Sequence, residues 1–187
     1  MTSATQLLSH QLNGAYEFVR HRVEGLTDEE FLWEPFPGCW TVRRGSDGRW
    51  SGDYADVDPD PAPFTTIAWR LVHLAECKLM YHEYAFGAGR LTWPEIDSAH
   101  TANTAIAELE RGQQLLVDDL AGLGNVDLDG PRLTNWGEEW PTWRIFWTMI
   151  DHDLHHGGEI GVLRDLYREG IMHRPAARAK QPQVQES

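Results

Sequence analysis

Residues 142–168 read TWRIFWTMIDHDLHHGGEIGVLRDLYR, and this stretch decides the fold. It follows Pro141, which suits the first turn of a helix, and it stops before Gly170, a common helix terminator. Its apolar residues recur at spacings of three and four, which brings them onto one face of a helix. The apolar members of this stripe are Ile145, Met149, Ile160, Leu163 and Tyr167. We therefore expect one helix over residues 142–168 whose stripe faces a hydrophobic core.

Two histidines belong to the same stripe. His152 and His156 are four residues apart, so their imidazoles project in one direction from adjacent turns, close enough to bind one cation. Three acidic residues flank the pair: Asp151, Asp153 and Glu159. Each is either a charge on a solvated helix face or a partner that orients an imidazole through its far nitrogen.

Three further segments show helical spacing. They cover residues 4–23, 64–86 and 94–123, and a short turn or helix is expected from Thr27. Helices of about 20–27 residues are roughly 30–40 Å long, which suits packing side by side. Nothing between them alternates strongly enough to require a sheet, although residues 128–140 have room for a short hairpin. The sequence thus predicts an all-α fold, a single four-helix bundle over residues 1–170 with long connections between helices 1 and 2 and between helices 3 and 4.

A third histidine lies on the inner stripe of the predicted helix 64–86. This stripe consists of Trp69, His73, Cys77, Met80 and Tyr84. A single core histidine is usually a hydrogen-bonded structural residue, but three inward histidines without a metal leave ring nitrogens unpaired, at about 1–3 kcal/mol each. Three imidazole ligands leave coordination positions open for water or substrate, as in catalytic metal sites. We therefore predict a metal site formed by His73, His152 and His156, and imidazole suits zinc, nickel, iron or copper.

Two neighbours of these histidines have alternative roles. His155 lies about 60° around the helix from His152, so it is either an outer partner of the site or an exposed residue. Cys77 follows His73 by one turn and is either a small buried apolar residue or a fourth ligand. A fourth protein ligand would make the site closed and structural.

Composition narrows the functional class. The 187 residues include 16 Lys and Arg against 29 Asp and Glu, a formal net charge of −13. This acidic balance argues against binding to nucleic acid or to an anionic membrane, and the apolar runs are too short to span a bilayer. The first residues lack the layout of a signal peptide, and two cysteines do not make a disulfide framework. We expect a cytoplasmic protein with a flexible basic tail over residues 171–187.

The segment of residues 45–63 is unusually rich in Asp and Pro. Its aspartates are Asp47, Asp53, Asp56, Asp58 and Asp60. Prolines interrupt them, and the glycine and glutamate that an EF-hand calcium loop requires are missing. We interpret the segment as a long surface loop, and long loops in compact domains often border functional sites.

Nine tryptophans are another unusual feature of the composition. Five of them lie in the predicted connections or near a helix start: Trp33, Trp40, Trp136, Trp140 and Trp143. They are either candidates for the rim of the metal site or ordinary anchors of the core and loops.

Three motifs together resemble the DinB/YfiT-like superfamily. They are IAWRLVHL at residues 67–74, DHDLHHGGEI at residues 151–160 and WEPFPGCW at residues 33–40, and the resemblance extends over about residues 5–170. It implies a four-helix bundle with a three-histidine metal site at His73, His152 and His156. Under this resemblance Gly157, Gly158 and Gly161 are small residues that let a neighbouring helix approach closely.

The resemblance also implies a class of chemistry. Members of the family include mycothiol-dependent maleylpyruvate isomerase and bacillithiol S-transferases, and the sulfoxide synthases of ergothioneine synthesis carry a related iron-binding domain. Some relatives have Glu at the position of His152, so metal preference differs within the family. The resemblance implies that a divalent metal activates a low-molecular-weight thiol such as mycothiol, bacillithiol or glutathione for attack on an electrophile. We expect the metal to be zinc or nickel, with iron as the next candidate.

Two other functions stay open from sequence. One is a non-catalytic metal-binding stress or sensor protein, and the other is a structural bundle that keeps its histidines for packing. The partners expected for the enzyme are a small thiol and a small electrophile, with no nucleic acid and no membrane. Homodimers occur among relatives, which makes a homodimer one candidate assembly.

Overall fold

Helices account for most of the structure, a computed structural model that describes residues 1–55, 57 and 59–170. In this part of the chain the α-helices are α1 (Ala4–Arg22), α2 (Asp28–Phe31), α3 (Ile67–Ala85), α4 (Ala102–Ala121) and α5 (Thr142–Arg168). The strands are β1 (Val42–Arg44), β2 (Trp50–Gly52), β3 (Pro131–Leu133) and β4 (Glu139–Pro141). Two single-turn 3-10 helices, η1 (Trp93–Glu95) and η2 (Asn125–Asp127), lie in the connections.

The long helices begin where side chains can cap them. The Ser3 hydroxyl accepts from the Gln6 amide at 3.1 Å and starts α1 at the predicted residue. The Thr66 hydroxyl accepts from the Trp69 amide at 3.2 Å, so α3 begins at Ile67, three residues after the predicted start. Helix α5 has the predicted bounds. Side-chain caps satisfy amides that the first turn leaves unpaired.

The predicted start of the helix at residue 94 is wrong. Pro94 lies in η1, where the Glu95 carboxylate turns back to accept from the Thr92 amide at 2.8 Å. The chain then becomes extended at Ile96, and α4 begins only after Thr101 caps it. A proline that suits a first turn therefore starts a single 3-10 turn here rather than the long helix.

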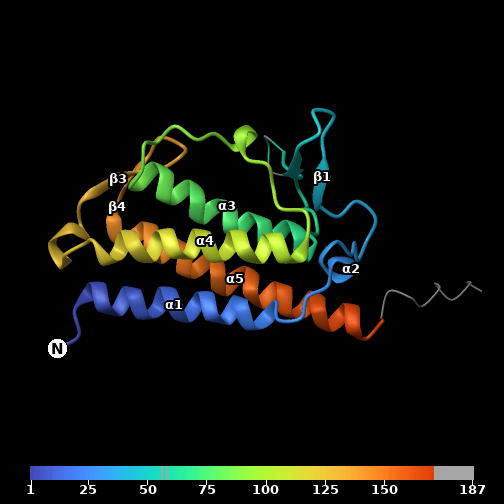
Figure 1. Ribbon diagram of the computed structural model, residues 1–187, viewed down its shortest axis with the longest axis horizontal. Coiled ribbons are helices and arrows are strands. Elements are labelled where there is room, and N and C mark those ends of the chain that lie inside the picture. Colours follow the sequence, from blue (N-terminus) through green and yellow to red (C-terminus); the bar gives the residue numbers. More distant parts are fainter. Residues whose placement is uncertain (56, 58, 171–187) are drawn as a thin grey trace, which may run out of the picture.

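Four of the helices pack lengthwise against one another. Helix α3 lies against α4 and α5, and α1 lies against α5 and α4 (Figure 1). The predicted apolar stripe of α5 is buried at Ile145, Met149, Ile160 and Leu163. A Cβ atom added at Gly157 would lie 2.9 Å from the Phe18 ring of α1, which confirms the close approach expected there. Gly161 is similarly close to Arg22, whereas Gly158 faces open space, so the expectation for Gly158 is wrong.

Two small hairpins lie at opposite ends of the helices (Figure 1). The hairpin β3–β4 confirms the short hairpin predicted at residues 128–140, although its second strand ends one residue later, at Pro141. The hairpin β1–β2 pairs Val42 with Gly52 and Arg44 with Trp50, which corrects the interpretation of residues 45–63 as a loop without strands. Its turn is closed by Asp47, whose carboxylate accepts from the Arg49 amide at 3.0 Å, and by Gly48 at φ 87°. The predicted all-α class therefore holds for the long helices but not for the connections, which contain two short β-hairpins.

Two further predictions concern the basic tail and the absence of a membrane span. The basic tail over residues 171–187 lies outside the described residues, as do Asp56 and Asp58. Among the described residues, no helix combines the length and the apolar character that crossing a bilayer requires.

Candidate metal centre

The structure brings the three predicted histidines together. His73 extends from the middle of α3, and His152 and His156 extend from the facing part of α5. One ligand atom from each lies within 4.8 Å of the others. The ring centroids are 5.2 Å apart for His73 and His156 and 5.6 Å apart for His73 and His152. Helical spacing and the packing of α3 on α5 thus create one cluster of three imidazoles.

The outer ring nitrogens of the two α5 histidines have oxygen acceptors. His152 Nδ1 lies 3.0 Å from the Thr148 carbonyl oxygen, and His156 Nδ1 lies 2.7 Å from a Glu159 carboxylate oxygen. Both contacts assign the proton to Nδ1, which leaves the lone pair on Nε2 of each ring. A hydrogen bond of this kind fixes the tautomer and the orientation of a histidine that binds a metal.

Glu159 is thus the flanking carboxylate that orients an imidazole. It pairs with the guanidinium of Arg70 from α3, and its other oxygen lies 3.3 Å from His155 Nε2. His155 is exposed and also contacts Glu159 at the outer side of the cluster. It is therefore both an exposed residue and an outer neighbour of the site, the two roles predicted as alternatives. Arg70 is a residue that sequence reasoning missed, although its position three residues before His73 places it on a neighbouring part of the same helix face.

Burial keeps His73 and His156 uncharged at neutral pH. Desolvation, reinforced by the neighbouring His152 and Arg70, lowers the pKa of His73 to about 4. Desolvation also lowers the pKa of His156 to about 2, with His73 and Arg70 adding to the shift. Burial lowers the pKa of Arg70 to about 10, so its guanidinium stays protonated beside the Glu159 carboxylate. Neutral imidazole is the form that binds zinc, nickel or iron, so the donor set fits the predicted metal ions.

Cys77 lies beside His73 but differs from the histidines. Its sulfur is 3.6 Å from His73 Nε2 and 3.7 Å from Nδ1, so it lies against the ring rather than along one lone pair. Burial raises the pKa of the Cys77 thiol to about 12. A protonated thiol in this position acts as a small apolar residue, which favours that alternative over a fourth ligand.

Neither cysteine is expected to react with Ellman's reagent in the native protein at pH 8. Cys77 is buried and remains a thiol far below its raised pKa, and Cys39 is only 2% exposed. Two equivalents of thiol should appear after denaturation, because the structure holds both cysteines in the free form. Rapid native modification of Cys77 would show that the thiol is ionised or accessible, and would reopen its role as a ligand.

The five tryptophans that were rim candidates separate into different environments. Trp40 lies 5.9 Å from Trp69, which stacks on His73, whereas Trp33 packs against Tyr167 near the end of α5. Trp136 and Trp140 pack on Tyr81, two turns along α3 from His73. Trp143 is 42% exposed at the start of α5.

Behind the histidines lies a buried ion pair that the sequence did not reveal. Lys78 of α3 and Asp153 of α5 are fully buried, with Nζ 2.7 Å from Oδ2. Lys78 also donates to the side-chain oxygen of Gln113 from α4 at 3.1 Å. The predicted alternatives for Asp153, a solvated charge or a partner of an imidazole, are both wrong. It lies four residues after Met149 and four before Gly157, and that buried spacing was the available signal.

The comparisons with known proteins agree with this architecture. A family model described as the DinB superfamily matches residues 11–160. The crystal structure of a DinB-like protein from Bacillus cereus ATCC 10987 is similar, with a TM-score of 0.61, 17% sequence identity, and coverage of 91% of this chain and 95% of that one. A conserved protein from Enterococcus faecalis gives a TM-score of 0.54 at 17% identity, covering 90% of this chain and 99% of that one. A comparison with curated proteins found no significant sequence match.

Proposed function

Because the chain belongs to the DinB superfamily, we propose that its histidine cluster binds a divalent metal ion through His73, His152 and His156. The observation that carries the proposal is the set of three imidazoles, each with a ring nitrogen within 4.8 Å of those of the other two. In two of them Nδ1 already makes a hydrogen bond to an oxygen atom. Zinc or nickel suits such a set best, and iron is the next candidate.

We further propose that the protein is a thiol-dependent S-transferase. A bound divalent ion would lower the pKa of a coordinated thiol and so supply a thiolate at neutral pH. The sulfur would form a bond to an electrophilic carbon, the leaving group would depart with the bonding electrons, and the thiol proton would pass to solvent. Three protein ligands leave room for an external thiol.

The chain's own residues explain why the thiol would come from outside. Cys77 is the cysteine beside the cluster, and burial keeps it protonated, with a pKa of about 12. It therefore cannot serve as the nucleophile near pH 7. Glu159 and the Thr148 carbonyl hold the Nδ1 atoms of His156 and His152, which leaves their Nε2 atoms free to bind a metal ion. We infer a low-molecular-weight thiol, of the mycothiol, bacillithiol or glutathione type, as the first substrate.

The metal is expected to bind stoichiometrically and to be lost in His156→Ala. Untagged protein would be loaded with zinc or nickel, desalted and measured by elemental analysis. His10→Ala is the matched control, because His10 is an exposed histidine of α1 outside the cluster. Wild-type protein that binds no stoichiometric metal and melts identically with and without chelator would contradict the metal site.

Turnover is tested on the same preparations. Metal-loaded protein would be mixed with glutathione, bacillithiol or mycothiol and with monochlorobimane as the electrophile, and conjugate fluorescence would be followed. The transferase predicts conjugation that is lost in His156→Ala and kept in His10→Ala. Metal binding without turnover for any thiol would instead support the non-catalytic metal-binding or sensor function.

A further inference from the structure

The ring of His73 is oriented differently from the other two imidazoles. Within the described part of the chain, its nitrogens have no oxygen acceptor, and their one hydrogen-bond contact is with the sulfur of Cys77. Its ring instead stacks on the indole of Trp69, with centroids 4.8 Å apart and planes 12° apart. The same indole meets the ring of His156 edge-on at 6.3 Å. Trp69 therefore forms a wall of the cluster that touches histidines from both α3 and α5.

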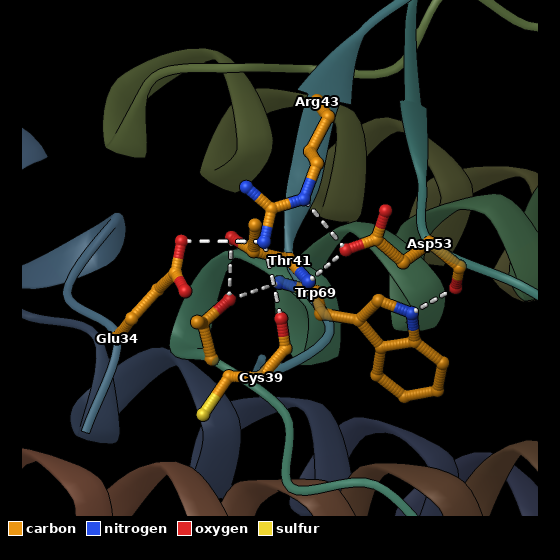
Figure 2. Close-up of polar contacts among 7 residues, drawn as sticks. Glu34, Cys39, Thr41, Arg43, Asp53 and Trp69 are labelled. Carbon is orange, nitrogen blue, oxygen red and sulfur yellow. Dashed lines mark hydrogen bonds and ion pairs between the residues drawn. The ribbon is translucent and has the colours of Figure 1, made fainter. Parts of the chain in front are cut away.

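The indole of Trp69 is itself fixed by the hairpin β1–β2. Its Nε1–H donates to the backbone carbonyl of Asp53 at 2.8 Å (Figure 2). A Cβ atom added at Gly52 would lie 3.6 Å from the indole, so the end of β2 packs directly on the ring. The hydrogen bond sets the rotation of the indole, and the packing sets its position.

Asp53 is held in place by an ion pair and by backbone hydrogen bonds. Its carboxylate accepts from Arg43 Nε at 3.0 Å and from the Thr41 amide at 2.9 Å. The Arg43 guanidinium continues outward to the Glu34 carboxylate at 3.3 Å and to the Cys39 carbonyl at 3.2 Å. Figure 2 shows these contacts converging on one end of the hairpin. A chain of direct contacts thus runs from Arg43 through Asp53 and Trp69 to His73.

We propose that Trp69 is a positioning residue for His73, and that Asp53 and Arg43 make the β1–β2 hairpin a supporting part of the metal centre. The inference rests on the proposed metal-binding function. Ligand histidines are normally oriented by a hydrogen bond to the second ring nitrogen, and loss of such support typically lowers metal affinity 10–100-fold. For His73 the flat face of an indole supplies that orientation instead.

The inference predicts graded losses of metal affinity. Trp69→Leu removes the flat aromatic surface and should weaken zinc binding about 10–100-fold, measured by competition with a chromophoric chelator. Trp69→Phe keeps a stacking ring without the N–H donor, so its loss should be smaller. Asp53→Ala removes the link to Arg43 and should give an intermediate loss. Trp147→Leu is the matched control, because Trp147 is 52% exposed on α5 and lies outside these contacts.

A spectroscopic readout separates positioning from general stability. The cobalt-substituted protein should show an altered ligand-field spectrum in Trp69→Leu and an unchanged one in Trp147→Leu. Thermal unfolding of the metal-free variants would report any loss of stability on its own. A Trp69→Leu protein with wild-type zinc affinity and an unchanged cobalt spectrum would overturn the inference, whatever its melting temperature.

The two proposals fail in distinguishable ways. Wild-type protein that binds no metal would refute the proposed function but not the stacking of Trp69 on His73. In that case the ring protons of His73 still report the stacking by NMR, because an indole shifts protons above its face upfield. Loss of this upfield shift in Trp69→Leu confirms the stacking on which the positioning role depends, and an identical His73 spectrum in wild type and variant contradicts it.

Discussion

Lys78→Met is expected to lower the free energy of unfolding by about 3–5 kcal/mol, because it leaves the buried carboxylate of Asp153 without its cation. This is a large part of the roughly 5–15 kcal/mol that stabilises an ordinary domain. Both side chains are fully buried, so solvent cannot replace the lost ion pair. Urea unfolding followed by far-UV circular dichroism would measure the change.

A second substitution separates the charge from the packing. Lys78→Met combined with Asp153→Asn removes both charges and should recover much of the lost stability. Arg111→Met is the matched control, because its pair with Glu108 is exposed and should be worth about 0–1 kcal/mol. If Lys78→Met cost no more than Arg111→Met, the buried pair would contribute little to stability.

Glu159→Ala is expected to weaken metal binding about 10–100-fold while leaving the three histidines in place. The substitution removes the acceptor that lies 2.7 Å from His156 Nδ1, and so frees the imidazole to rotate or to change tautomer. It also leaves the partly buried guanidinium of Arg70 without its carboxylate, beside the proposed cation site. Zinc competition titrations at pH 7 would measure the affinity.

Conservative and control variants sharpen this prediction. Glu159→Gln keeps an oxygen acceptor for His156 but loses the charge, so its affinity should lie between those of wild type and Glu159→Ala. Asp151→Ala is the matched control, because Asp151 is an exposed carboxylate on the same helix beside His152 and does not belong to the histidine cluster. Equal affinities for Glu159→Ala and Asp151→Ala would show that the hydrogen bond to His156 has no influence on the site.

The spacing of apolar residues predicted the features that are determined within a single helix, namely its bounds and its inward face. Helix α5 has the predicted bounds, and His73, His152 and His156 meet because each belongs to an inward stripe. The roles of the acidic residues were not predictable in this way. Asp153 is buried opposite Lys78, and Glu159 contacts the cluster because Arg70 and His156 converge on it. Those partners are brought together by packing between helices, which spacing within one helix does not specify.

The hairpin β1–β2 escaped prediction for a different reason. Its strands have three residues each, too few for an alternating pattern to stand out. Its stability comes from the turn at Asp47 and Gly48 and from contacts of Asp53 with Arg43 and Thr41. A segment that looks like an acidic loop in sequence therefore becomes an ordered strand pair through polar contacts.

The buried polar network also determines how the helices are aligned. Lys78 from α3 meets Asp153 from α5 and Gln113 from α4, and Gln113 in turn donates to the Leu12 carbonyl of α1 at 3.4 Å. If only apolar side chains met, a helix could slide by one turn, about 5.4 Å, and still bury a similar apolar surface. A buried ammonium and carboxylate do not allow this slide, because it would separate the two charges and leave each buried without a partner. His152 adjoins Asp153 in the chain, so the register that satisfies the charges is also the register in which the imidazoles of α3 and α5 meet.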